Sequence, residues 1–217
     1  MTSRFINGAK HAVSTALAPA AAITAITNSN PAVASSAAPP AEGSLVVLKS
    51  NWPELNDTVA RVGAVTANTF ELENVDTSDV IRFPAGEGIG TYEVASTFVS
   101  LSQVRDVDQS GGEQQFFTYQ NIEDATSRQR QDPTFKNPMV MRVDMAYDPA
   151  LPWYTVLDEL DRAKEPVVLR EILPGGDTIY YFGMLSFNKV PTKKPNEHML
   201  VSATFSLYAD PIRYPAV

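Results

Sequence analysis

Acidic residues stand next to each other at two places in the chain, Glu123-Asp124 and Asp158-Glu159. Paired carboxylates can act as acid and base or bind calcium, but neighbouring residues on a strand or a helix point in different directions. These pairs are therefore predicted to lie on solvated surfaces. The chain has no cysteine, and its two histidines, His11 and His198, are far apart in the sequence. Neither a disulfide, a thiolate zinc site nor a histidine-based metal cluster is expected.

Two glycine-rich segments, Gly86 to Gly90 and Gly111-Gly112, come closest to a phosphate-binding loop. Neither is followed by a Lys-Ser or Lys-Thr pair, and neither lies between a predicted strand and the start of a predicted helix. The Gly-x-Ser-x-Gly turn that presents a nucleophilic serine is also missing from the sequence. The sequence therefore predicts a protein that is not an enzyme, with no catalytic residues, no cofactor and no metal site.

The net charge of the chain limits the kinds of partner that it is expected to bind. The chain of 217 residues has a formal net charge of -8, so its overall field repels phosphate and disfavours sequence-specific nucleic-acid binding. A wall along which DNA passes without binding is compatible with the same charge. Charged residues are only 19% of the chain, against roughly 25% in typical soluble domains. This fits a subunit that buries its surface against other copies, and it fits equally a monomer with a Ser/Thr/Asn-rich surface.

The N-terminal region has some features of a targeting segment. Arg4 and Lys10 precede an apolar stretch from Ala12 to Ile26, and small residues run from Ala32 to Ala38. The apolar stretch is rich in Ala, Ser and Thr rather than Leu, and Pro19 interrupts it. It also lacks the roughly 20 strongly apolar residues of a membrane-spanning helix. We therefore expect neither a signal peptide nor a membrane anchor here.

Alternating apolar and polar residues predict strands in the second half of the chain. Residues 139–145 and 199–207 both place apolar side chains at every second position, which is the pattern of a half-buried strand. Between them, residues 167–173 and 178–190 are rich in β-branched and aromatic residues. The tetrapeptide Pro174-Gly175-Gly176-Asp177 separates these two segments and predicts a hairpin turn.

One segment has the spacing of a helix instead. Its apolar residues recur on one face, at Trp153, Val156, Leu157, Leu160 and Ala163. Asp148 is the expected N-cap with Pro149 at the first helical position, and Pro166 closes the far end. We expect one amphipathic helix, about Ala150 to Lys164, that packs its apolar stripe against the sheet.

A long charged segment follows two further predicted strands. Residues 92–107 and 114–120 favour strands, and Gln109 to Glu113 predicts a flexible turn between them. The segment Asn121 to Pro138 is polar, contains two prolines and is expected to lack regular structure. In a monomer it would be a loose loop, whereas in a stacked assembly it would be an arm that contacts the neighbouring ring. The candidate contact residues in this arm are Glu123, Asp124, Arg128, Arg130, Asp132 and Lys136.

Residues 23–90 differ from the rest of the chain in composition. Short predicted strands at 45–48, 58–65 and 69–73 are joined by Pro, Gly and Asn residues, and the segment ends in a candidate linker at 83–88. The sequence thus predicts a discontinuous main domain, residues 1–22 and 91–217, with a small β insertion at 23–90. One continuous β domain with an irregular edge is the alternative.

Several sequence segments occur in a shared order: RFINGAK from Arg4, QSGGEQQF from Gln109, FGMLSFN from Phe182, Asn196-Glu197, and ATFSL from Ala203. In that order they resemble the major tail tube proteins of long-tailed, non-contractile bacteriophages, and the last three resemble the C-terminal hairpin of that siphophage family. Within residues 23–90, Leu55-Asn56 and NTFEL from Asn68 resemble a small β-barrel module appended to such proteins. The similarity extends over most of the chain.

The resemblance implies a mainly β fold, a β-sandwich or partial barrel with one flanking helix and an inserted β-barrel-like module. It implies hexameric rings stacked into a hollow tube, in which each subunit adds strands to an inner barrel and DNA passes through the lumen during ejection. The barrel candidates are strands within 91–120 and 178–207. The expected partners are other copies of this chain, the tape measure, terminator and tip proteins, and passing DNA that is not specifically bound. No membrane is expected.

The resemblance also implies a virion protein of the tail that is assembled in the host cytoplasm and has no catalytic residues. Self-assembly has an independent physical reason, because an exposed sheet edge is an aggregation hazard that disappears when neighbours close a barrel. Head-to-tail stacking then propagates into a filament, and its lumen is expected to be acidic or neutral. Two alternatives stay open. One is a terminator or connector that stops at one ring, and the other is a surface module that binds carbohydrate or a receptor through aromatics such as Trp52, Tyr92 and Tyr119.

Overall fold

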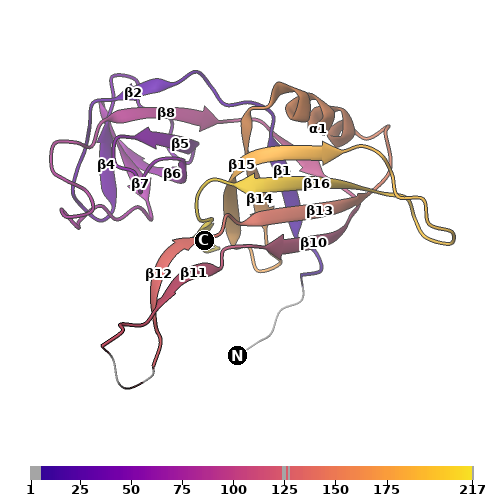
Figure 1. The fold of residues 1–217 in the computed structure, drawn as a ribbon. Helices are drawn as coiled ribbons and strands as arrows, with labels where there is room; N and C mark the ends of the chain where they lie inside the picture. Colours follow the sequence, from indigo (N-terminus) through magenta and orange to yellow (C-terminus); the bar gives the residue numbers. More distant parts are fainter. Residues whose placement is uncertain (1–5, 124–125, 127, 217) are drawn as a thin grey trace.

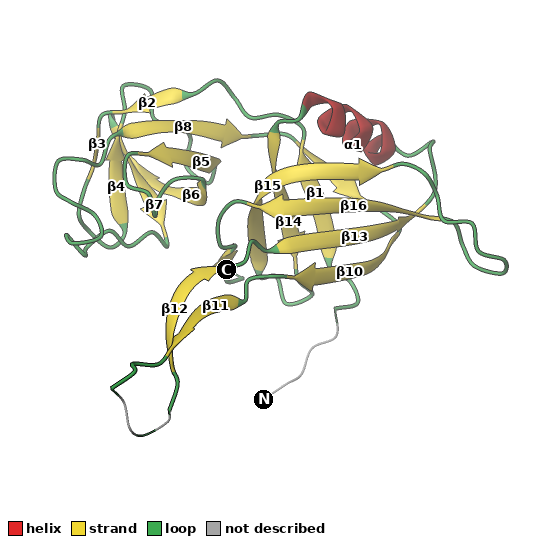
Figure 2. Cartoon of the chain, viewed as in Figure 1, coloured by secondary structure: helices red, strands yellow, loops and turns green. Residues whose placement is uncertain are grey.

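The computed structural model describes residues 6–123, 126 and 128–216 of the chain. Strands make up 48% of the structure and helix 6%, so the predicted mainly β class is confirmed. In the described part of the chain the strands form two large antiparallel sheets and a separate two-stranded hairpin (Figures 1 and 2). The helix lies beside the sheet that contains the C-terminal strands (Figure 2).

The larger sheet, called the main sheet below, has eight strands among the described residues. Seven of them lie in the order β10, β13, β16, β15, β14, β1 and β9, and β17 pairs with the first residues of β15. Their bounds are β1 Lys10–Ser14, β9 Phe98–Leu101, β10 Val104–Ser110, β13 Val140–Ala146, β14 Pro166–Ile172, β15 Thr178–Asn188, β16 Leu200–Leu207 and β17 Ile212–Tyr214.

The alternation in the sequence gives the main sheet a buried face and an outer face. Met141, Val143 and Met145 of β13 are buried, and β16 buries every second residue from Val201 to Leu207. The predicted hairpin is confirmed, because β14 and β15 pair from Pro166 opposite Met184 to Ile172 opposite Thr178. The core of this sheet is therefore built from the positions that the period-two pattern marks.

The predicted amphipathic helix is α1, Pro152–Ala163, and it packs against β15 and β9. Its apolar stripe enters the core of the main sheet through Trp153, Leu157 and Leu160. The predicted N-cap is wrong. Leu151 is the N-cap without a side-chain hydrogen bond, and Asp148 Oδ1 instead accepts a hydrogen bond from Ala150 N at 3.1 Å, in the turn before the helix. Lys164 ends the helix in the left-handed conformation.

The second sheet lies in the order β2, β8, β5, β6, β7, β4 and β3. Its strands are β2 Ala21–Ile23, β3 Ala25–Ile26, β4 Ala32–Ser35, β5 Leu45–Ser50, β6 Thr58–Val65, β7 Thr69–Glu73 and β8 Gly90–Ala95. Only Thr24 separates β2, which pairs with β8, from β3, which pairs with β4. One bent segment thus joins both ends of the sheet, which curls around a core that includes Trp52, Phe70 and Tyr92.

A third apolar cluster joins the two sheets. It contains Val47 and Val59 of the second sheet with Phe182 and Tyr214 of the main sheet. The Tyr214 hydroxyl accepts a hydrogen bond from Arg61 N at 2.8 Å and donates one to the carbonyl oxygen of Glu73 at 3.1 Å. The insertion of residues 23–90 into a main domain stays a proposal. In the structure β8 belongs to the second sheet, so residues 91–95, which the prediction gave to the main domain, pair with β5 and β2.

The segment that was expected to lack regular structure contains a strand. β12, Arg130–Lys136, pairs antiparallel with β11, Gln114–Tyr119, and the hairpin projects away from both sheets (Figure 1). We call β11, β12 and the residues between them the arm. The prediction failed because β12 buries none of its side chains, so its sequence has no apolar alternation to mark it.

Candidate assembly interface

The strands at the two ends of the main sheet are β10 and the shorter β9, and β10 is the edge beside the arm. It pairs with β13 on one side, and no strand in the described residues pairs with its other side. The side chains of Arg105, Asp106 and Asp108 on this strand are exposed. An unpaired strand edge presents rows of backbone donors and acceptors to any other chain that approaches it. Charged side chains protect such an edge from indiscriminate pairing, and a matching neighbour can still complete the sheet.

The outer face of β10, β13, β16 and β15 is polar. The strand registers place the outward residues in three rows. One row is Asp108, Arg142, Thr204 and Ser186, the next is Asp106, Asp144, Ser202 and Asn188, and the third, beside the arm, is Ser110, Val140, Ser206 and Met184. This face therefore carries mostly hydroxyl, amide and charged side chains, with Val140 and Met184 as its apolar positions.

The charges on this face are negative in balance. Within the paired rows, three carboxylates, from Asp106, Asp108 and Asp144, stand against the one guanidinium of Arg142. Arg105 lies outside these rows, at the irregular position of β10 between Val104 and Asp106. Arg142 Nε donates to Asp144 Oδ1 at 2.9 Å, and Ser202 Oγ donates to the same oxygen at 2.6 Å. The single cation is thus engaged by its neighbours, and the face offers little to attract phosphate.

The arm carries exposed aromatic rings on both of its faces. Phe116, Phe117 and Phe135 are 54%, 62% and 67% exposed, and Ile122 beyond β11 is fully exposed. Phe117 stacks on Tyr119 with ring centroids 6.2 Å apart, while Phe116 lies opposite Pro133 on the other face. Exposed apolar groups gathered on one projecting element mark a contact surface for another chain.

A bend at the base of the arm separates it from the main sheet. Gly111 and Gly112 both have positive φ, and a Cβ on Gly111 would meet the Pro138 carbonyl oxygen at 2.1 Å, so only glycine fits there. Gly112 N donates to Asn137 O, and Asn137 N donates to Glu113 O. The predicted flexible turn at 109–113 is thus a bend within a continuous two-stranded ribbon, in which β10 and β13 continue into β11 and β12.

The predicted contact residues are spread over the arm and do not form one cluster. Arg130, Asp132 and Lys136 lie on β12 and are exposed, as are Glu123 and Arg128 nearer the tip. Asp124 lies outside the described residues. Lys136 Nζ is 3.5 Å from Asp210 Oδ2 at the base of the arm. The charged candidates stay a prediction. The sequence argument did not consider the exposed rings of the arm, which come mainly from the run Gln-Gln-Phe-Phe-Thr-Tyr at 114–119.

The barrel candidates, strands within 91–120 and 178–207, stay a prediction. In the subunit, β13 lies outside these ranges, pairs with both β10 and β16, and supplies Arg142 and Asp144 to the polar face. Residues 91–95, which lie inside the first range, belong to the second sheet.

A buried polar cluster lies behind the outer face. Tyr181 Oη donates to Glu171 Oε2 at 2.7 Å, and Gln109 Nε2 donates to Tyr181 Oη at 3.3 Å. His11 Nε2 is 3.3 Å from Glu171 Oε1, without the alignment of a good hydrogen bond. His11 lowers the pKa of Glu171 below its usual range; burial opposes this, and the hydrogen bond from Tyr181 adds to it. Burial in turn raises the pKa of the Tyr181 hydroxyl. The cluster links β1, β14, β15 and β10 and is structural in character.

The described residues hold no group of His, Asp and Glu side chains arranged to bind a metal ion. Two of the aromatics considered for a carbohydrate site, Trp52 and Tyr92, are buried in the core of the second sheet. In the same described part of the chain no helix is long and apolar enough to span a bilayer. The open strand edge, the polar outer face and the aromatic arm are therefore the surfaces that stand out.

These three features are typical of a β-sheet subunit that assembles with other chains: an open strand edge, a polar face and a projecting arm with exposed apolar residues. Comparison with known families agrees with this. The family described as phage tail tube protein, TTP, matches residues 50–216, from β5 to the end of the described chain. The chain belongs to this family and is a structural component of a bacteriophage tail. A search of curated proteins found no match.

Proposed function

We propose that this chain forms hexameric rings that stack into the hollow tube of a bacteriophage tail, through which DNA passes during ejection. The observation that carries the proposal is the unpaired edge of β10 beside a polar outer face. No catalytic step is assigned to the chain. Tape measure, terminator and tip proteins would be its partners in the tail, which is assembled in the host cytoplasm.

Ring closure would complete the open edge of the main sheet. A free edge strand of seven residues is long enough to template pairing with another chain. When the β10 edge of each copy pairs with a strand of the next copy in a closed ring, this edge is no longer exposed. The inner barrel of the tube would then be built from β10, β13, β16 and β15 of every subunit.

The outer face of these four strands would line the lumen. Its carboxylates outnumber its guanidinium by two, and the remaining positions are mostly hydroxyl and amide side chains. DNA carries a negative charge for about every 1.7 Å of its axis. A lining rich in Lys and Arg would bind this charge at many points and hold the DNA, whereas a hydroxyl-rich, slightly acidic lining lets it slide.

Negative-stain electron microscopy of the purified protein tests this proposal. Tubes with a central channel, growing with concentration, are the expected result. Single rings that never stack would favour a terminator or connector, and monomers at all concentrations would favour a surface binding module. A map of the tube with a continuous Lys/Arg lining would contradict the role given to the polar face.

A further inference from the structure

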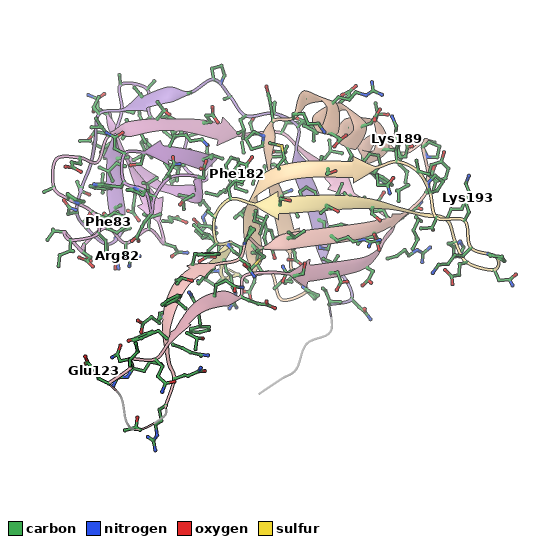
Figure 3. All side chains as sticks on the ribbon, viewed as in Figure 1. Arg82, Phe83, Glu123, Phe182, Lys189 and Lys193 are labelled. Atoms are coloured by element: carbon green, nitrogen blue, oxygen red, sulfur yellow. The ribbon has the colours of Figure 1, made fainter. Side chains whose placement is uncertain are left out.

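A cleft opens at the margin of the junction between the main sheet and the second sheet. Phe182 of β15, labelled in Figure 3, lies in the apolar cluster that joins the two sheets. Tyr180 lies on the same face of β15, and Arg170 of β14 pairs with it. Beside these two residues the packing leaves a cavity of about 300 Å³. Its lining consists of Phe98, Arg170 and Tyr180 on one side, and of Gly43 to Leu45 and Val94 to Ser96 on the other.

The cleft is a positively charged site in an acidic chain. Arg170 is the only charged residue of the described lining, which contains no Asp or Glu, although the chain has a net charge of -8. Arg170 is partly buried and makes no salt bridge with a described residue. A charge that is withdrawn from water without a counter-charge lowers stability. An anion that enters the cleft would remove this cost.

The guanidinium of Arg170 is covered on one face and open at its end. Its Cζ atom lies 4.6 Å from the centroid of the Phe98 ring, so the ring stacks on the guanidinium. The Nε atom is shielded from solvent and has no hydrogen-bond partner. The two Nη groups are not shielded in this way, and they donate to no described residue. They are therefore the donors that a ligand in the cleft can reach.

The hydroxyl of Tyr180 is a second donor beside this guanidinium. It makes no hydrogen bond with a described residue. Burial raises the pKa of the hydroxyl, and the nearby Arg170 and Arg61 oppose this shift, so the hydroxyl stays protonated at neutral pH. One positive charge and one neutral donor match a singly charged anion.

The geometry of the guanidinium favours a carboxylate over a phosphate. The end of a guanidinium binds the two oxygens of a carboxylate through two parallel hydrogen bonds. A phosphate group carries a charge of about -1.5 to -2 at neutral pH, which the single cation of the cleft does not balance.

We propose that this cleft binds a carboxylate group, held end-on by the two Nη groups of Arg170 and by the hydroxyl of Tyr180. The site does not depend on the proposed stacking of rings, because all of its lining residues belong to one subunit. Two sources can supply the carboxylate. One is a small free molecule, and the other is an exposed Asp or Glu side chain of another copy.

Saturation-transfer NMR with acetate as the probe tests the site at constant ionic strength. The methyl signal of acetate reports its binding to the dilute subunit, and a titration gives the dissociation constant. Arg170→Met should weaken acetate binding by about tenfold or more, and Tyr180→Phe by roughly threefold to tenfold. Arg170→Lys keeps the charge without the two parallel donors and should lie between the unmodified protein and Arg170→Met. The matched control Arg105→Met removes the same charge at an exposed position of β10 and should bind acetate as the unmodified protein does.

Two results would overturn the assignment. Equal acetate binding by the unmodified protein and the Arg170 variants would show that the cleft is not the site. Displacement of acetate by inorganic phosphate at about a tenfold lower concentration would show a site for a more highly charged anion. If Arg170→Met does not fold, Arg170→Lys and Tyr180→Phe decide the question.

The same measurement on assembled tubes separates the two sources of the carboxylate. If a neighbouring copy fills the cleft, assembly should abolish the acetate signal, and Arg170→Met should raise the concentration needed for tubes. If a small molecule fills it, the acetate signal should persist in the tubes. Failure of the unmodified protein to form tubes would count against the proposed function, whereas the binding of acetate to the dilute subunit tests the cleft alone.

Discussion

Removal of the arm should leave the subunit folded and abolish the tube. The variant joins Glu113 to Asn137 through an inserted Asn-Gly pair in place of residues 114–136. The two ends are already close, since Asn137 N donates to Glu113 O at 2.9 Å and Gly112 N donates to Asn137 O at 3.1 Å. Asn-Gly favours the tight turn that closes such a ribbon.

The free energy of unfolding should change little on this deletion. All seven residues of β12 are exposed, and no described residue of the arm belongs to a buried apolar cluster. The deletion chiefly removes the ion pair of Lys136 and Asp210, whose side chains are 58% and 77% exposed. Such an exposed ion pair contributes about 0–1 kcal/mol to stability. The shorter connection between β10 and β13 acts in the opposite direction, because each halving of its length lowers the entropic cost of closing the loop by about 0.6 kcal/mol. The net change should stay within about 1 kcal/mol of a total of about 5–15 kcal/mol.

Urea unfolding of the dilute protein measures the free energy of unfolding. Sedimentation with negative-stain microscopy measures whether tubes form. The expected result is an unchanged unfolding curve, a soluble particle and no long tubes. A loss of more than about 3 kcal/mol, which is the size of a core defect, would show that the arm belongs to the fold. Normal tubes from the deleted chain would show that stacking does not depend on the arm.

Three further predictions concern the subunit itself. Leu157→Ala, at a fully buried position of α1, should lower the free energy of unfolding by about 2–5 kcal/mol in urea titrations. Tyr214→Phe leaves the amide of Arg61 without its acceptor and should cost about 1–3 kcal/mol, whereas Tyr208→Phe at an exposed ring should be neutral. The pKa of Glu171 is lowered in the folded state, so ionised Glu171 stabilises the fold. This stabilisation is present above the ordinary pKa of glutamate and is lost as the pH falls through the lowered pKa. Glu171→Gln should therefore be less stable at pH 7 and lose less stability on acidification, and an unchanged pH profile of the melting temperature would contradict this.

The sequence was most informative where local pattern and burial agree. Residues 58–65 and 69–73 were predicted as strands and are β6 and β7 with the same bounds. The helix was found because Trp153, Leu157 and Leu160 repeat at helical spacing and are all buried. In these elements one side faces a core and the other faces water, so the pattern of apolar residues records the structure directly.

The predictions were poorest in the arm and around the edge strand β10. β12 has no buried face in the isolated subunit, so its sequence follows no alternation and predicts a loop instead of a strand. The neighbours of β10 depend on long-range pairing through β13, which local sequence does not encode. The helix start was misplaced because both Asp148-Pro149 and Leu151-Pro152 carry a proline suited to a first turn. The candidate contact residues remain a prediction.

The central claim is that copies of this chain complete the open edge of the main sheet. A cryo-electron microscopy reconstruction of the assembled protein tests it most directly. The account predicts a tube in which the free side of β10 is hydrogen-bonded to a strand of the adjacent subunit and the polar face of β13 and β16 lines the channel. A tube in which the free side of β10 faces solvent, or purified protein that stays monomeric at every concentration, would contradict it.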